Sequence, residues 1–233
     1  MPSATQDWID NLPTSHLIAE FSVWSADLAR LADDMQRIAP YADILHIDVA
    51  DGHFAPALLF FPDAVAAVRK VSKTPIHIHL MVADDILLSQ IEQFCDAGCD
   101  LISFHVENAK VADAAFDLLE ARNVAAGMVL RVETPVRQVA QFIPRLRFLT
   151  LLGTAIGVKG QGLNDRATQR LMAAKKLIGA ANLPQRIVLA ADGGIRENTV
   201  PLLRSAGAET VVLGSLAFGA PNLSERMAWL KAL

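Results

Sequence analysis

The sequence predicts a (β/α)8 barrel, an α/β fold of the TIM-barrel class, from the rhythm of its apolar segments. Short β-branched runs alternate with longer amphipathic segments from near the start of the chain to its end. Eight such units in 233 residues give about 29 residues per unit, which is the size of one βα repeat. A doubly wound open sheet is the alternative, but no G-x-G-x-x-G motif follows the first strand.

The expected strands are almost wholly apolar, as strands are when helices cover both faces of a parallel sheet. They span residues 18–23, 43–49, 76–82, 101–106, 124–131, 148–152, 186–190 and 210–213. We expect helices between them, and three of these should begin near Ser25, Pro135 and Asn164, which are residue types that favour a helix start. Gly98 and Gly207 each stand just before an expected strand and should end the preceding helix.

The composition excludes several classes of protein. Hydrophobic residues make up 52% of the chain and charged residues 20%, which suits a large core and excludes intrinsic disorder. The longest apolar stretches, such as residues 58–61, are far shorter than the roughly 18 residues of a membrane-spanning helix. The net charge of −4 and the pI near 5.8 argue against a nucleic-acid-binding surface. We therefore expect neither a membrane nor a nucleic-acid partner.

The chain shows no linker and no break in composition, so we expect residues 1–233 to form one barrel domain, with residues 1–16 as an N-terminal extension. No Lys or Arg precedes Arg30, so the basic start of a secretory signal is absent and a cytoplasmic location is expected. Cys95 and Cys99 lie four apart on an expected helix. We interpret them as reduced thiols, because two cysteines build neither a disulfide framework nor a four-ligand zinc site.

Catalytic groups of a TIM barrel lie at the C-terminal ends of its strands, and three expected strands carry polar residues there. His46 and Asp48 are two apart on the second strand and so point to the same side. His79 lies at the end of the third strand, and Asp192 follows the seventh. Two imidazoles and two carboxylates suit one divalent transition metal ion, such as Zn²⁺, Mn²⁺, Fe²⁺ or Co²⁺. Burying all four without partners would be costly, which favours a shared site.

The other histidines are interpreted as structural or exposed. His105, at the end of the fourth strand, is expected to be a hydrogen-bonded core residue, because a lone buried histidine is more often that than a ligand. His77 is expected to point toward the helices, and His16, which precedes the first strand, is expected to be exposed.

A family resemblance is carried by the run His-Ile-Asp-Val-Ala-Asp-Gly-His-Phe at residues 46–54, followed by Pro56. It resembles the second-strand signature of the ribulose-phosphate 3-epimerases, and it is long and specific. Residues 79–81, 192–195 and 214–215 match later signatures of that family, although each of these alone would be weak. Residues 21–27 resemble its opening strand and first helix, so the resemblance extends from about residue 21 to residue 218.

The resemblance implies a ribulose-phosphate-binding barrel that uses one divalent metal ion and forms a homo-oligomer. In that family the positions matching His46, Asp48, His79 and Asp192 bind the ion, and the two aspartates also act as acid and base. Inverting a carbon beside a ketone requires removing its proton from one face and returning a proton to the other, so two carboxylates are needed. The metal would hold the ketone oxygen and the neighbouring hydroxyl.

The expected partner is a small sugar phosphate. Barrels often bind phosphate with the loops after strands seven and eight, and at glycines the backbone amides can approach an anion closely. Residues 157–161 resemble the family's glycine-rich flap over the substrate. The expected substrate-binding residues are Ser22, His79, Met81, Gly157, Gly160, Gln161, Gly193, Gly194, Gly214 and Ser215.

The chain departs from the family pattern around the substrate and keeps the metal ligands. Ala50 and Leu152 stand where the family usually has methionine, and Ala57 where it has asparagine. The flap usually begins Asn-Pro-Gly-Phe-Gly-Gly, whereas residues 155–160 read Ala-Ile-Gly-Val-Lys-Gly. Residues 131–135 read Arg-Val-Glu-Thr-Pro where the family has Asn-Pro-x-Thr-Pro. These changes leave the sugar open among ribulose 5-phosphate, allulose 6-phosphate and a shorter tetrulose phosphate.

Two of the departures introduce positive charge. Lys159, in the expected flap, is predicted to meet the phosphate of the substrate. Arg131 is interpreted as structural, with its side chain held by Glu133 or Glu107.

The sequence favours a metal-dependent isomerase that interconverts D-ribulose 5-phosphate and D-xylulose 5-phosphate by two-base proton transfer at carbon 3. A decarboxylase related to orotidine phosphate decarboxylase is disfavoured, because such enzymes have Asp-x-Lys-x-x-Asp at the second comparable strand end and here Ala50 stands in place of the lysine. A non-catalytic barrel that senses a sugar phosphate is also open, although both aspartates and both histidines are retained.

Overall fold

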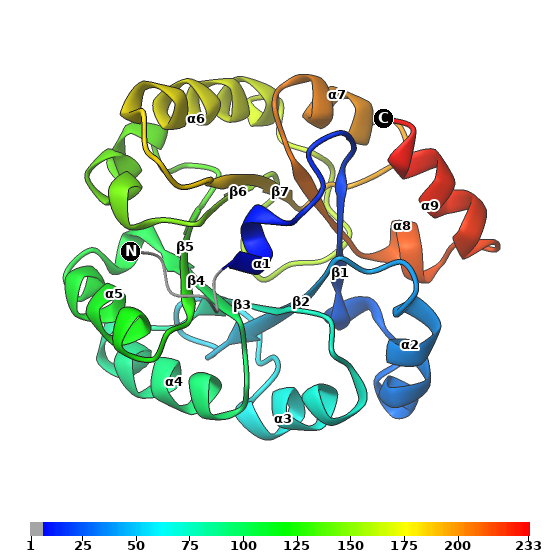
Figure 1. Cartoon of the computed structure of the whole chain (residues 1–233), viewed down its shortest axis with the longest axis horizontal. Helices are drawn as coiled ribbons and strands as arrows, with labels where there is room; N and C mark the ends of the chain where they lie inside the picture. Colours follow the sequence, from blue (N-terminus) through cyan, green and yellow to red (C-terminus); the bar gives the residue numbers. More distant parts are fainter. Residues whose placement is uncertain (1–6) are drawn as a thin grey trace.

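Eight parallel strands close into a barrel in the computed structural model, which describes residues 7–233 (Figure 1). Each strand pairs with the next along the chain, and the last pairs with the first. The predicted (β/α)8 fold is confirmed, and every strand lies within two residues of its expected bounds. The strands are β1 (Ile18–Ser22), β2 (Ile44–Ala50), β3 (Ile76–Met81), β4 (Leu101–His105), β5 (Ala125–Leu130), β6 (Phe148–Leu152), β7 (Val188–Asp192) and β8 (Thr210–Leu213).

Helices surround the barrel and cover the outer faces of the strands (Figure 1). They are α2 (Leu31–Ile38), α3 (Pro62–Val71), α4 (Asp84–Asp96), α5 (Ala112–Ala121), α6 (Ala167–Ala181), α7 (Val200–Ser205), α8 (Ser215–Phe218) and α9 (Leu223–Lys231). Short 3₁₀ turns η1 (Val23–Ser25), η2 (Leu28–Arg30) and η3 (Val106–Asn108) follow β1 and β4. Among residues 7–233, no helix is long and apolar enough to cross a membrane.

All three expected helix starts differ in detail, and α6 begins at Ala167, three residues after Asn164. The expected start near Ser25 is wrong, because Asp27 and not Ser25 caps the first turn, by accepting a hydrogen bond from the Ala29 amide at 3.0 Å. The segment after Pro135 is helical, but it is the 3₁₀ helix η4 (Val136–Arg145), which contains Pro144. Gly98 and Gly207 do end helices, and both have positive φ values that favour glycine.

The N-terminal segment closes one end of the barrel. Residues 1–6 of the expected extension lie outside the described residues, and α1 (Asp7–Asp10) lies across the barrel in Figure 1. Ile9 and Leu12 pack against apolar residues at the N-terminal ends of the strands. Arg147 fixes this segment through the Asp10 carboxylate at 2.7 Å, and Arg186 through the Leu12 carbonyl at 2.8 Å. Of the two ends of the barrel, the one where the strands terminate is therefore left open for a site.

Candidate active site and metal centre

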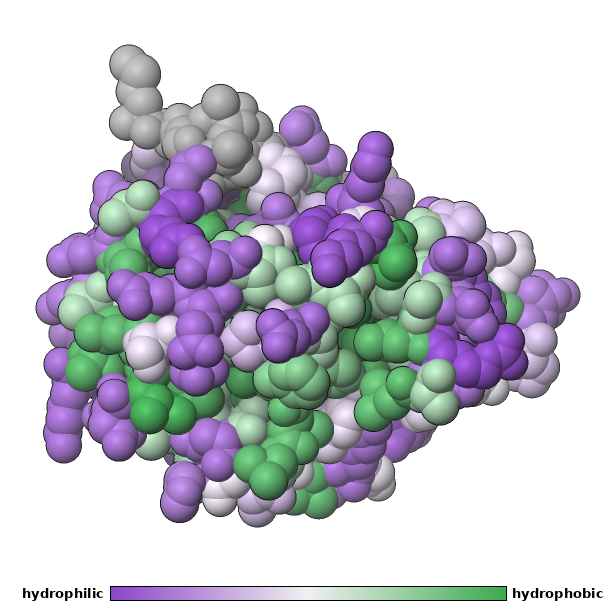
Figure 2. Space-filling model, turned by 90° about the horizontal axis from the view of Figure 1, so that it is seen from below, coloured by the Kyte–Doolittle hydropathy of each residue, from purple (hydrophilic) through white to green (hydrophobic). Residues whose placement is uncertain are grey.

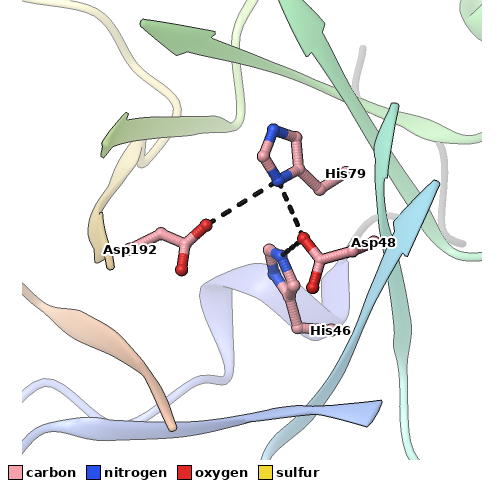
Figure 3. Close-up of side chains that lie close together, drawn as sticks. All are labelled: His46, Asp48, His79 and Asp192. Carbon is pink, nitrogen blue, oxygen red and sulfur yellow. Dashed lines mark hydrogen bonds and ion pairs between the residues drawn. The ribbon is translucent and has the colours of Figure 1, made fainter. Parts of the chain in front are cut away.

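The four predicted metal ligands converge at the C-terminal ends of the strands (Figure 3). His46 and Asp48 come from β2, His79 from β3 and Asp192 from the end of β7. The Oδ1 atom of Asp48 lies 3.2 Å from His46 Nε2 and 3.1 Å from His79 Nδ1. Asp192 faces them from the other side of His79, with its Oδ2 atom 3.7 Å from His79 Nδ1. One nitrogen or oxygen from each side chain lies within 4.8 Å of the others.

This arrangement fits a divalent metal ion. Ligand atoms about 2.1 Å from a zinc ion are separated by about 3.4 Å in tetrahedral geometry and by about 3.0 Å at right angles. The distances of 3.1, 3.2 and 3.7 Å in the cluster lie close to this range. Two imidazoles and two carboxylates also form a donor set that several transition metals accept. A buried His/Asp cluster that could hold a metal ion is therefore present.

The two aspartates of the cluster differ in their affinity for protons. Burial by itself would raise the pKa of Asp48, but the charges and hydrogen bonds of His46 and His79 outweigh it and hold that pKa well below its usual value. Burial, together with the Asp48 carboxylate, raises the pKa of Asp192 to about 6. The site thus combines an ionised carboxylate with one that can gain or lose a proton near neutral pH, which suits a pair of acid–base groups.

His77 does not point toward the helices, so that expectation is wrong. Residues two apart on a strand share a face, and His77 therefore points into the barrel like His79. Its Nδ1 atom lies 2.6 Å from Glu20 Oε1, and the same oxygen lies 2.8 Å from His46 Nδ1. These two imidazoles hold the pKa of Glu20 at about 2, although burial alone would raise it. A buried carboxylate thus contacts an expected metal ligand.

His105 is hydrogen-bonded and fully buried, as expected, but its partner is a residue of the site. Its Nε2 atom lies 2.9 Å from His79 Nε2, and the two rings stack with their centroids 5.1 Å apart. Its Nδ1 atom lies 3.2 Å from the Glu107 carboxylate. Burial lowers the pKa of His105 to about 4. His105 and Glu107 therefore belong to the surroundings of His79, a connection that sequence reasoning missed.

A cavity of about 320 Å³ opens above the cluster at the mouth of the barrel. Asp48, His79 and Asp192 line it, whereas His46 is fully buried below. Trp24, Thr154 and Arg196 also line it and were not predicted. All ten expected substrate-binding residues line this cavity: Ser22, His79, Met81, Gly157, Gly160, Gln161, Gly193, Gly194, Gly214 and Ser215.

The backbone at Gly193 and Gly194 requires glycine. Their φ values are +87° and +70°, a region that side chains rarely tolerate. A Cβ atom at Gly194 would lie 2.7 Å from the Cα of Leu163, and one at Gly193 would overlap Thr154. The loop after β7 therefore packs closely against Thr154 and Leu163, and both glycines line the cavity.

Lys159 and Arg131, the two positive charges that depart from the family pattern, lie in different surroundings. Lys159 lines the cavity, and its Nζ atom donates to the Trp24 carbonyl at 2.6 Å and lies 4.4 Å from the centre of the Trp24 ring. Arg131 instead donates to the Phe54 carbonyl at 2.8 Å and lies over the Phe54 ring. This contact agrees with the structural interpretation of Arg131. Its partner, however, is Phe54 and not the expected Glu133 or Glu107.

The other departures from the family pattern gather beside Met81. Ala50, Ala55 and Met81 form a small buried apolar cluster, against which Ala57 and Ile156 pack. Leu152 lines the cavity itself. Ala50 and Leu152, which stand where the resemblance led us to expect methionine, therefore lie in this cluster and in the cavity wall, respectively.

Comparison with known proteins assigns the chain to a family. Residues 18–218 match the model of the ribulose-phosphate 3 epimerase family. The chain belongs to this family. A ribulose-phosphate 3-epimerase of Bacillus subtilis is 32% identical over 199 residues, covering 85% of this chain and 90% of that protein. Ribulose-phosphate 3-epimerase 1 of Cupriavidus necator is 34% identical over 206 residues, covering 86% of this chain and 84% of that protein.

Solved structures of other proteins share the fold of this epimerase-family chain. An orotidine 5'-phosphate decarboxylase from Pyrococcus horikoshii has a TM-score of 0.64 at 13% identity, covering 92% of this chain and 97% of that one. A 3-hexulose-6-phosphate synthase has a TM-score of 0.61 at 19% identity, covering 93% of this chain and 96% of that one. At such low identity these likenesses show the barrel fold alone.

Proposed function

We propose that the protein is a divalent-metal-dependent ketose-phosphate 3-epimerase that interconverts D-ribulose 5-phosphate and D-xylulose 5-phosphate. The observation that carries this proposal is the pair of carboxylates, Asp48 and Asp192, in one cluster with two imidazoles at the barrel mouth. Membership of the epimerase family supports the reaction class. A zinc, manganese, iron or cobalt ion held by the cluster would polarise the ketone of the substrate.

In the proposed mechanism, the two aspartates exchange protons with carbon 3 from opposite faces. One carboxylate removes the proton, and the other supplies a proton to the opposite face, so the configuration inverts without rotation of the intermediate. Asp48 is held in place by the Ser22 hydroxyl, which donates to its Oδ2 atom at 3.2 Å. Asp192, whose pKa is about 6, can take up and release a proton near neutral pH.

The phosphate of the substrate is proposed to lie against the loops after β7 and β8. Gly193, Gly194, Gly214 and Ser215 line that side of the cavity, and the three glycines carry no side chain that would keep an anion from the backbone. The flap residues Gly157, Gly160 and Gln161 also line the cavity, and we propose that they exclude water from the bound sugar.

The identity of the sugar is the part of the proposal that needs a direct assay. D-ribulose 5-phosphate, D-allulose 6-phosphate and a tetrulose phosphate should be tested in parallel with the zinc-loaded protein. We expect turnover of ribulose 5-phosphate. Turnover of only one of the other two sugars would identify that sugar as the substrate, and the altered residues beside Met81 would explain the change. If the protein binds these sugars but turns over none of them, it is a non-catalytic sensor. A decarboxylase is already disfavoured, because Ala50 stands where such enzymes have a lysine.

Removing the charge of Lys159 should weaken binding of the phosphorylated sugar. Lys159 lines the same cavity as Gly193 and Gly194, so its ammonium can move from the Trp24 carbonyl to a bound phosphate. We expect Lys159→Ala to raise KM about tenfold, which corresponds to about 1.4 kcal/mol of lost binding. Steady-state kinetics on phosphorylated and unphosphorylated ketoses would measure this effect.

The same substitution should leave the weak activity on the unphosphorylated ketose unchanged. Lys176→Ala, on the exposed face of α6, provides a matched loss of one lysine outside the cavity and should not change either KM. Equal losses on both substrates would mean that Lys159 shapes the flap instead of binding phosphate.

We further propose that the protein acts as a cytoplasmic homo-oligomer. Free thiols at Cys95 and Cys99 suit a reducing compartment. Figure 2 views the side of the barrel that includes α3, where apolar groups lie between hydrophilic ones. Leu58 and Phe61, which lie before α3, are 82% and 60% exposed and would be covered by a second copy. Sedimentation equilibrium would test this, and a monomer at all concentrations would contradict it.

A further inference from the structure

A buried carboxylate lies directly beneath the proposed metal centre. Glu20 on β1 has no exposed surface, and neither do the His46 and His77 side chains that contact it. One oxygen of Glu20 contacts both imidazoles, and the other lies 3.3 Å from the Thr210 hydroxyl, which also donates to the Ile18 carbonyl at 3.0 Å. Charged side chains are rarely fully buried unless they are paired. The buried charge of Glu20 is therefore stabilised by its contacts with the two histidines.

The chemistry of the carboxylate determines where the protons lie on the two imidazoles. An ionised carboxylate can only accept hydrogen bonds, so His46 and His77 both donate from Nδ1 to Glu20. In a neutral His46 that carries its proton on Nδ1, the lone pair is on Nε2. That is the nitrogen that lies in the cluster, 3.2 Å from Asp48 Oδ1. Glu20 therefore selects the form of His46 that can bind a metal ion.

His77 in turn holds Glu20 in place. Because Nδ1 of His77 donates to Glu20, its Nε2 accepts a hydrogen bond from the Ser103 hydroxyl at 2.7 Å. Space for Ser103 comes from Gly127 on the neighbouring strand, where a Cβ atom would overlap the Ser103 hydroxyl. The carboxylate is thus fixed by residues from three other strands and cannot turn away from His46 without leaving buried groups unpaired.

We propose that Glu20 is a positioning residue of the metal centre, which holds His46 in the tautomer that binds through Nε2 and adds a negative charge beneath the cation. This inference rests on the metal-dependent function proposed above. Metal-ligating histidines commonly donate their second N–H to a carboxylate, which orients the ring and makes the ligand more basic. Here that carboxylate comes from the middle of β1, outside the four-residue cluster.

The test is the zinc affinity of the Glu20→Gln variant. Glutamine has the same shape but lacks the charge, and affinity should fall 10- to 100-fold, as is typical for loss of such a partner. Competition of the metal-stripped full chain with a chromophoric chelator, using Zn²⁺ alone, measures the affinity. Nitrogen-15 spectra of the zinc-loaded protein, labelled at histidine, should show a proton on His46 Nδ1, with its signal displaced in the variant.

Two further variants distinguish positioning from a purely structural role. Glu209→Gln removes a half-buried carboxylate that binds Arg186 and has no contact with the four-residue cluster, so it should lower the thermal midpoint without changing zinc affinity. Glu20→Asp keeps the charge but withdraws it from His46, and its zinc affinity should lie between those of the wild type and Glu20→Gln. The aspartate variant decides the question if the glutamine variant does not fold.

The outcomes separate this inference from the proposed reaction. Wild-type zinc affinity and an unchanged His46 signal in both Glu20 variants would overturn the positioning role and leave the epimerase proposal standing. A wild-type protein that binds zinc but epimerises no ketose phosphate would overturn the reaction and leave the role of Glu20 standing. A wild-type protein that binds no zinc would overturn the Glu20 inference together with the metal centre.

Discussion

We expect Asp192→Asn to stop interconversion of the two epimers while substrate still binds. An asparagine amide fills the same space as the carboxylate but cannot take up or supply a proton at carbon 3. Loss of a general acid–base group typically lowers turnover about 10²- to 10⁴-fold, and inversion needs such a group on each face. The kcat should fall by at least this factor in a coupled assay, whereas calorimetry should show a similar substrate affinity.

Solvent exchange would show whether the two aspartates have separate roles. Each single variant keeps one base, so it should exchange the carbon-3 proton of only one epimer with deuterated solvent. Asp192→Asn and Asp48→Asn should therefore exchange opposite epimers, although neither should convert one into the other. Exchange of both epimers by either variant would contradict the two-base mechanism.

Metal content is the necessary control for this experiment, because both aspartates belong to the cluster that could hold the ion. Only variants that keep about one ion per chain report on proton transfer. Asp113→Asn is a matched control, because Asp113 is exposed in the first turn of α5 and belongs neither to the cluster nor to the cavity. This variant should leave kcat unchanged. Wild-type turnover by both aspartate variants would show that the mechanism is wrong.

The fold could be predicted from sequence because each strand is covered on both faces and therefore consists of a continuous apolar run. The bounds of β6 and β8 agree with expectation, whereas β7 begins two residues later than expected. Arg186, at the expected start, is drawn instead to the N-terminal segment, where it donates to the carbonyls of Leu12 and Pro13. Local pattern cannot reveal a contact with residues more than 170 positions away.

The proposed metal ligands could be identified because they are polar residues that interrupt apolar strands at their C-terminal ends. Glu20 also interrupts an apolar strand and could have been noticed, but its partners lie 26 and 57 positions away in sequence. Only the pairing of β1 with β2 and of β2 with β3 brings them together. The orientation of His77 was available from sequence, since it lies two residues before His79 and shares its face.

We expect His79→Ala to lose most of the bound metal. His79 lies between the two carboxylates, with Nδ1 3.1 Å from Asp48 and 3.7 Å from Asp192. Without the imidazole, the ion keeps three ligands, and water enters the space that the ring occupied. The zinc affinity should fall by more than the roughly 10- to 100-fold that loss of an outer partner costs. Elemental analysis after gel filtration would measure this as a fall from about one ion per chain.

His53→Ala is the matched control, because His53 is exposed in the loop after β2 and lies outside the cluster. It should keep the metal content of the wild type. The His79 variant should also lose turnover in proportion to its lost metal, and excess zinc should restore part of both. If His79→Ala retained one ion per chain with wild-type affinity, the metal would have to be bound elsewhere. The convergence of the four side chains would then be explained by hydrogen bonding alone.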